Sequence, residues 1–240
     1  TLAGLNVATE RMKAHEDEHA VFLSGNGPLV KVLREALAID EVEQTKGLAP
    51  DLKVPKGMAL KKAKTFIQPI HDFRDDNLIS KNPPVEKVVV FDEAQRAWTK
   101  DQTSKFMQSK RGIPDFGMSE PEFLLSVMDR HSGWCTVVCL IGGGQEINTG
   151  EAGIVEWLTA LQGRFSDWDV YCSDKINGPE YNWGNSISKH LQAIKPTIEP
   201  DLHLSVSVRS YRSERVSECK GQPKSVPAWR CKSVPPGMRI

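Results

Sequence analysis

The stretch Val88 to Trp98, VVVFDEAQRAW, decides the fold of this chain. Three valines and a phenylalanine run directly into two adjacent carboxylates, Asp92 and Glu93. A strand that is apolar on both faces is typical of the centre of a parallel sheet, and ligands of such sheets bind at the carboxyl ends of the strands. The stretch therefore predicts a buried strand that brings an acidic pair to a ligand-binding edge.

An acidic pair at the end of a buried strand is the pattern of a Walker B element. In that interpretation Asp92 holds Mg²⁺, directly or through water, and Glu93 polarises the water that attacks the γ-phosphate of a nucleotide. Apolar residues followed by two acids also occur at ordinary strand ends, where the acids cap a following helix. The rest of the sequence is needed to distinguish a Walker B element from an ordinary strand end.

The composition is that of an ordinary globular protein. The chain has 240 residues, 39% of them hydrophobic and 26% charged, with a formal net charge of zero. No apolar run approaches the ~20 residues that span a bilayer, and nothing resembles a signal peptide, so we expect a cytoplasmic protein without a membrane partner. Cysteines form no CxxC pair, which favours structural roles in a reducing compartment over metal binding. Any nucleic-acid contact must be local, because the net charge provides no global attraction.

Helices and strands are predicted to alternate along the chain. The expected elements are a helix over 1–15, strands over 20–24, 134–141, 168–172 and 202–208, and helices from Pro28, from Ser119, around Trp157 and over 187–194. Ser119 and Glu122 fit a capping box at the start of their helix. This alternation predicts a three-layer α/β domain with a mostly parallel sheet.

Three other segments have less regular patterns. Periodicity fades over 40–64, where five lysines gather between Lys53 and Lys64, and the segment is interpreted either as a solvated face or loop or as a local nucleic-acid contact. Apolar residues from Phe66 to Phe73 recur at helical spacing and predict one helix. The polar segment 99–117 is expected to run over the edge of the sheet.

Two further strand ends carry side chains that suit a ligand. Three glycines and then Gln145 follow the strand over 134–141, and Gln145 offers both a donor and an acceptor. The last predicted strand leads into Arg209, which could bind a phosphate or pair with the acids that follow it. Since parallel strands end at one edge, a single nucleotide could contact both residues and the acidic pair.

The phosphate cradle of such a site does not occur within the sequence, because GxxxxGK followed by Ser or Thr is absent. The chain opens on Thr1, not Met, and continues as an amphipathic helix, as a chain does just after the Gly-Lys of a Walker A motif. We therefore expect Thr1 to end a Walker A motif whose glycines, lysine and preceding strand lie upstream. Its hydroxyl would join Asp92 at Mg²⁺.

Five stretches give the chain a resemblance to a known family: SGNGPLVKVLREAL at 24–37, QPIHDFR at 68–74, VVVFDEAQRAW at 88–98, CLIGGGQEINTGEAGI at 139–154 and SVSVRSYRSE at 205–214. They resemble the Schlafen-group-3-like P-loop ATPases, which are related to superfamily I DNA/RNA helicases. The resemblance runs from Thr1 to about Glu218. We expect one RecA-like P-loop NTPase domain over 1–218 and an extended, basic, proline-rich tail over 219–240.

The resemblance implies the first motor domain of a helicase-like ATPase that hydrolyses ATP with Mg²⁺ and acts on DNA or RNA. It assigns Mg²⁺ binding to Thr1 and Asp92, and the catalytic base to Glu93. It assigns γ-phosphate sensing to Gln145 and the neutralisation of transition-state charge to Arg209. All five residues would contact the nucleotide or its metal.

The chain departs from the family pattern in two places. The Walker A lysine is absent, and a second RecA-like domain with its arginine is missing or replaced by the basic tail. An arginine finger contributes roughly 10³- to 10⁵-fold in rate, so these residues alone are expected to hydrolyse ATP weakly or not at all. Two alternatives stay open: a nucleotide-dependent switch with protein partners in a defence or signalling complex, and an inactive truncated product.

Overall fold

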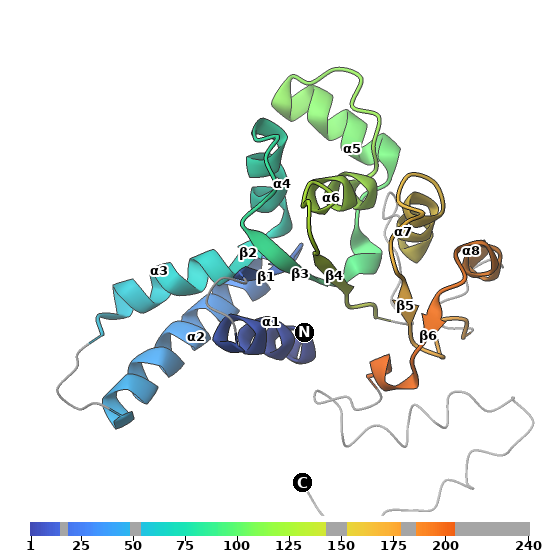
Figure 1. Cartoon of the computed structure of the whole chain (residues 1–240). Coiled ribbons are helices and arrows are strands. Elements are labelled where there is room, and N and C mark those ends of the chain that lie inside the picture. The colour runs from blue at the N-terminus through green and yellow to red at the C-terminus, as the bar shows by residue number, and fades with distance from the viewer. Residues whose placement is uncertain (15–18, 49–53, 143–152, 179–185, 205–240) are drawn as a thin grey trace, which may run out of the picture. The chain divides into compact units, whose positions relative to one another are not determined.

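A computed structural model describes residues 1–14, 19–48, 54–142, 153–178 and 186–204 (Figure 1). The chain divides into a large unit, Thr1–Val170 with Ile176–Thr197, and a small unit, Tyr171–Lys175 with Ile198–Ile240. The large unit is built on a four-stranded sheet with the order β2-β1-β3-β4. Its strands are β1 (His19–Ser24), β2 (Ile67–Pro69), β3 (Glu86–Asp92) and β4 (Thr136–Cys139).

All of the strand pairs in this sheet are parallel, so their carboxyl ends meet at one edge. Ser24 of β1 pairs with Asp92 of β3 on one side and with Pro69 of β2 on the other. Residues Val88 to Asp92 are buried, as the apolar run predicts for a central strand. The predicted strand therefore exists, and its acidic end lies at the carboxyl edge of the sheet.

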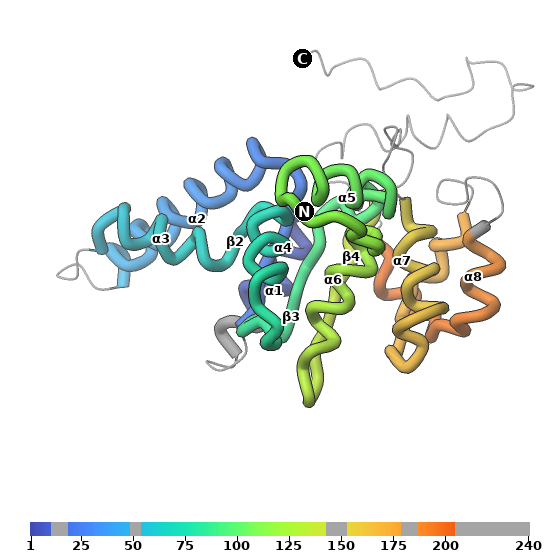
Figure 2. The backbone as a smooth tube through the Cα atoms, turned by 90° about the horizontal axis from the view of Figure 1, so that it is seen from above, coloured from blue at the N-terminus to red at the C-terminus, as the bar shows by residue number. Residues whose placement is uncertain are grey.

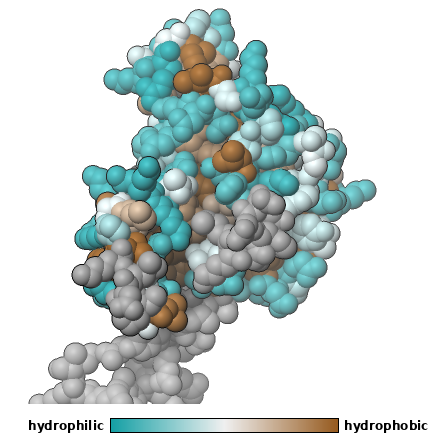
Figure 3. Space-filling model, turned by 60° about the vertical axis from the view of Figure 1, so that its left-hand side comes forward, coloured by the Kyte–Doolittle hydropathy of each residue, from teal (hydrophilic) through white to brown (hydrophobic). Residues whose placement is uncertain are grey.

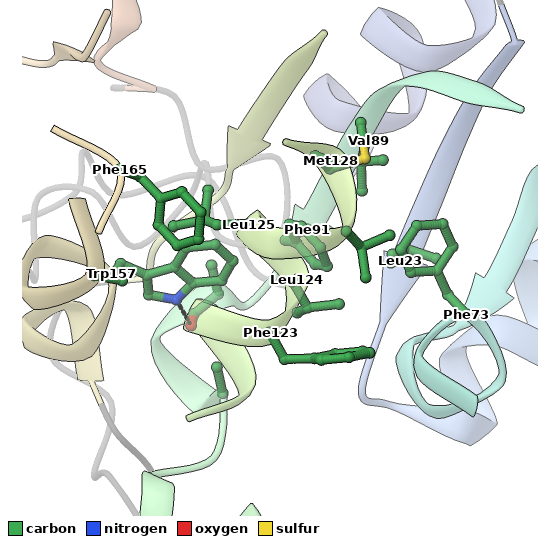
Figure 4. Packing of buried hydrophobic residues seen from close by; sticks show 14 of the residues in the cluster. Leu23, Phe73, Val89, Phe91, Phe123, Leu124, Leu125, Met128, Trp157 and Phe165 are labelled. Atoms are coloured by element: carbon green, nitrogen blue, oxygen red, sulfur yellow. Dashed lines mark hydrogen bonds between the residues drawn. The ribbon is translucent and has the colours of Figure 1, made fainter. Parts of the chain in front are cut away.

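Alternate residues of β1 and β3 face opposite sides of the sheet, and each side is covered by helices. Val21, Leu23, Val89 and Phe91 belong to one core, which Phe73, Phe123, Leu124 and Trp157 complete (Figure 4). These come from α4 (Ile70–Ile79), α6 (Glu120–Met128) and α7 (Gly153–Gln162).

The second core covers the opposite side of the sheet. It joins Phe22, Val88 and Val90 to side chains of α1 (Leu2–Ala14) and α2 (Gly27–Leu48). Helices on both faces of a parallel sheet confirm the predicted three-layer α/β fold.

Most of the described residues of the segment over 40–64 are helical, so its exposed lysines form a solvated helical face. Helix α2 continues to Leu48, and α3 (Lys56–Phe66) packs against it, as Figure 2 shows. Ion pairs join the two helices: Lys62 Nζ lies 2.8 Å from Glu41 Oε1, and Lys56 pairs with Glu35. In the view of Figure 3 the surface is mainly hydrophilic, with hydrophobic side chains in separate patches. Pairing between the two helices stabilises turns that the weak periodicity alone did not predict.

The single helix predicted from Phe66 to Phe73 is wrong, because the short strand β2 separates α3 from α4. The excursion over 99–117 contains α5 (Lys100–Phe106) and one π-helical turn, η2 (Met107–Arg111). Ser119 caps α6 as predicted: its Oγ accepts a hydrogen bond from the Glu122 amide at 3.3 Å.

The strand predicted over 168–172 is shorter and belongs to another sheet. Strand β5 (Tyr171–Cys172) pairs with β6 (Thr197–Ile198) in a separate two-stranded sheet. Leu202, where another strand was predicted to begin, ends the 3₁₀ turn η3 (Pro200–Leu202), and residues 205–208 of that predicted strand lie outside the described residues. The predicted helix over 187–194 exists as α8 (Ser186–Ile194). Within the part of the chain that the structure describes, no helix is long and apolar enough to cross a membrane.

Candidate nucleotide site

The first residue of the chain lies against the acidic end of β3. The Thr1 hydroxyl donates to both carboxylate oxygens of Asp92, at 3.1 and 3.2 Å. Thr1 also begins α1, because its carbonyl accepts the Leu5 amide at 3.0 Å. Asp92 is only 6% exposed, so its carboxylate depends on nearby groups for compensation. The fold thus brings together two predicted Mg²⁺ ligands that are 91 positions apart.

Glu93 turns the chain sharply after the strand. Its backbone is left-handed, with φ 54° and ψ 47°, a conformation that costs a non-glycine residue of order 1–3 kcal/mol and that clusters at functional sites. Its carboxylate is 26% exposed, and Oε2 accepts a hydrogen bond from Arg96 Nη1 at 3.1 Å. The neighbouring acids therefore differ: Asp92 is enclosed, while Glu93 is accessible to a ligand or to water.

Contacts from the residues just after β4 and from α7 hold the 3₁₀ turn η1 (Ala94–Arg96) that follows Glu93. The Ala94 amide donates to the Leu140 carbonyl at 2.9 Å, and Trp157 Nε1 donates to the Ala94 carbonyl at 2.9 Å (Figure 4). Gln95 Oε1 accepts the Gly142 amide at 3.2 Å, which links this turn to the end of β4. The sequence did not lead us to predict a role for Gln95, although this residue lies in the stretch VVVFDEAQRAW.

A cavity of about 310 Å³ opens beside the acidic pair. Acidic, basic and aromatic side chains line it, and the basic ones are His71, Arg74, Arg96 and Arg111. Its size is at the lower limit of small-molecule pockets, and its position at the carboxyl edge of a parallel sheet is where such folds bind ligands. The cationic groups and the acids together suit a phosphate-bearing ligand with its metal ion.

A buried ion pair forms one wall of this cavity. Arg74 Nη1 lies 3.2 Å from Glu120 Oε1, and both residues are almost fully buried. Burial raises the pKa of the Glu120 carboxyl, while the hydrogen bond from the Trp98 amide and the charge of Arg74 oppose the rise. Neither residue was predicted as part of the site.

Oxygen ligands of the kind that Mg²⁺ prefers are present in the Thr1 hydroxyl and the Asp92 carboxylate. Mg²⁺ is usually bound through one or two protein groups, with water and substrate phosphates completing its shell, so this pair fits the ion. The described residues contain no group of three or more His, Cys, Asp or Glu side chains arranged to hold a metal.

Two predicted site residues, Gln145 and Arg209, lie outside the described residues, as does Lys53 of the lysine-rich segment. Their assignments therefore stay predictions. Lys61 and Lys64 are exposed on α3.

A family model described as "Schlafen group 3, DNA/RNA helicase domain" matches residues 1–219. Comparison with curated proteins and with solved structures finds no match. The matched segment covers nearly the whole chain and includes Thr1, the acidic pair and the walls of the cavity.

Proposed function

Because the chain belongs to the Schlafen group 3 DNA/RNA helicase domain family, we propose that it is the first RecA-like motor domain of a helicase-like ATPase that binds and hydrolyses ATP with Mg²⁺. The observation that carries the proposal is the contact of the Thr1 hydroxyl with both oxygens of Asp92, directly before Glu93. DNA or RNA is the proposed polymer on which it acts, the cytoplasm its proposed location, and residues 1–218 the proposed extent of the domain.

Thr1 and Asp92 would hold Mg²⁺ at the end of β3. When bound, Mg²⁺ neutralises charge on the phosphates of ATP. Glu93, the more exposed acid of the pair, would orient the attacking water and accept its proton. Arg96, which donates to Glu93, keeps that carboxylate in one place until the substrate binds.

The family resemblance extends the proposal to two more residues. Gln145 would sense the γ-phosphate, and Arg209 would neutralise charge in the transition state. Both assignments rest on the resemblance alone, because the two residues lie outside the described part of the chain.

The test is ATP hydrolysis by the natural full-length protein, measured with and without single-stranded RNA or DNA. We expect Mg²⁺-dependent hydrolysis that nucleic acid stimulates, and that Asp92→Asn abolishes. The matched control is Asp167→Asn, which makes the same change at an exposed position beyond α7 and should leave hydrolysis unaltered. Equal hydrolysis by the Asp92 variant and the wild type would rule out Asp92 as a metal ligand.

A second candidate function is a nucleotide-dependent switch that acts on a protein partner. The ion pairs of Lys56 with Glu35 and of Lys62 with Glu41 favour it, because they neutralise part of the basic segment that would otherwise bind nucleic acid. Replacing Lys53, Lys61 and Lys62 by alanine separates the two functions. A motor that binds nucleic acid through this segment shows a shallower salt dependence of binding in the variant, whereas the switch shows no change and no stimulation by nucleic acid.

A further inference from the structure

The buried pair of Arg74 and Glu120 requires an explanation beyond stability. Arg74 on α4 is 1% exposed and Glu120 on α6 is 3% exposed. Taking two charges out of water costs several kcal/mol per ion, and apolar replacements of buried pairs are often neutral or stabilising. A pair of this kind is therefore expected to have a role in fixing one conformation.

Glu120 holds the residue at which the acidic turn ends. Its carboxylate Oε2 accepts the Trp98 amide at 3.1 Å, and its own amide donates to the Trp98 carbonyl at 3.0 Å. Both main-chain groups of Trp98 are thus bound by one residue of α6. The turn from Glu93 to Trp98 is fixed at its beginning by the residues just after β4 and by α7, and at its end by Glu120.

Arg74 in turn fixes Glu120. Besides its bond to Glu120, Arg74 donates from Nε to Asp75 Oδ1 at 3.3 Å. Its guanidinium carbon lies 4.5 Å from the ring centre of Phe106 and 5.2 Å from that of Trp98. The aromatic rings and the two carboxylates leave the guanidinium little freedom to move, so Glu120 is held in one position.

We propose that Arg74 and Glu120 are positioning residues for Glu93. By holding Trp98 they keep the turn from Glu93 to Trp98 in the conformation that presents the Glu93 carboxylate to the cavity. The left-handed backbone of Glu93 needs such support, because its strain persists only where the surroundings impose it. The inference rests on the proposed function in one respect, namely that Glu93 acts in ATP hydrolysis.

The decisive variant replaces both members of the pair, Arg74→Met with Glu120→Leu. No buried charge is left unpaired, so this double variant should fold, with a melting temperature lowered only by the loss of the hydrogen bond to the Trp98 amide. The Trp98 amide loses its partner and should exchange with solvent at least about tenfold faster, as expected for loss of a hydrogen bond to a charged group. The turn then keeps only one of its two main-chain bonds to residue 120, and kcat at saturating ATP should fall by about 10²-fold.

Val30→Ala is the control for a loss of stability alone. Val30 on α2 is 1% exposed, and it belongs to the core on the opposite side of the sheet from Arg74. At a temperature where this variant stays folded, its kcat and the exchange of Trp98 should match those of the wild type. A purely structural role of the pair predicts that the double variant also keeps the wild-type kcat, although its Trp98 amide has lost the carboxylate partner.

Each outcome decides the inference. Unchanged protection of the Trp98 amide in the double variant overturns it, whether or not the protein hydrolyses ATP. Faster exchange with an unchanged kcat also overturns it, because the turn then moves without effect on the reaction. If the wild type binds ATP but does not hydrolyse it, the proposed function fails, and the exchange measurement alone decides whether Arg74 and Glu120 hold the turn.

Discussion

The indole of Trp157 offers a direct measure of how firmly the acidic turn is held. Trp157 is 5% exposed, its ring centre lies 5.3 Å from that of Phe91, and its Nε1 donates to the Ala94 carbonyl at 2.9 Å. Trp157→Phe keeps an aromatic ring in the core but removes this hydrogen bond. The Ala97 amide also reaches the Ala94 carbonyl, at 3.3 Å, so the carbonyl keeps one partner.

The expected loss of stability has two parts. The missing hydrogen bond costs about 1 kcal/mol, at the lower end for a buried group because of the remaining partner. The cavity left by the smaller ring adds about 1 kcal/mol. We therefore expect Trp157→Phe to lower the free energy of unfolding by about 2 kcal/mol, measured by urea denaturation followed by circular dichroism.

Trp168→Phe is the matched control. Trp168 Nε1 donates to Asp129 Oδ1 at 2.9 Å, but this bond is exposed, and water can replace the lost donor. The control should lose about 1 kcal/mol less than Trp157→Phe. Equal losses in the two variants would refute the reasoning that the Trp157 bond holds a buried carbonyl of the turn.

Two further predictions concern α1 and Glu120. A Cβ at Gly4 would lie 2.5 Å from Leu140 Cδ1 and 2.8 Å from Val90 Cγ1. Gly4→Ala should therefore lower the free energy of unfolding by about 1 kcal/mol, after the better helix propensity of alanine is counted. Gly47→Ala is the control and should not lower it, because a Cβ there meets nothing within 4 Å. Burial raises the pKa of the Glu120 carboxyl above 4.5, so this carboxyl binds its proton more tightly in the folded protein than in the unfolded chain. The free energy of unfolding should therefore fall as the pH rises from 4.5 through the pKa of Glu120 in the folded protein. The charged groups of α4 that act on Glu120 are Arg74 and His71. In Glu120→Gln, denaturation curves recorded at a series of pH values should show a smaller fall in stability with pH. The series stays above pH 4, where the lowered pKa of Asp75 has no influence.

The central strand and its acidic end were predictable because their signal is local. A short apolar run rich in valine favours a buried strand, and the acids that follow it then lie where the strand ends. The cap at Ser119 was predictable for the same reason, since it involves residues three positions apart.

Strand β2 was missed because its residues also fit a helical spacing. The overlooked signal is Pro69, which has no amide to donate and disfavours the helical conformation of Gln68 before it. Strand β5 illustrates another limit: an apolar run can predict a strand, but not the sheet to which the strand belongs.

The pair of Arg74 and Glu120 could not be found from spacing, because 46 positions separate its members. Locally Arg74 is one basic residue on a helix, and Glu120 is an ordinary acid in a first helical turn. A signal exists in hindsight, since Arg74 lies four residues after Ile70 and next to Phe73, on the face of α4 that packs on the core.

The most direct test of the account is the rate of ATP hydrolysis by Glu93→Gln in the natural full-length protein, at saturating Mg²⁺ and ATP. The amide keeps the shape of the side chain and cannot accept the proton of the attacking water. We predict a fall in kcat of about 10²- to 10⁴-fold, with ATP binding retained. Hydrolysis at the wild-type rate would contradict the claim that the acidic end of β3 is the catalytic centre.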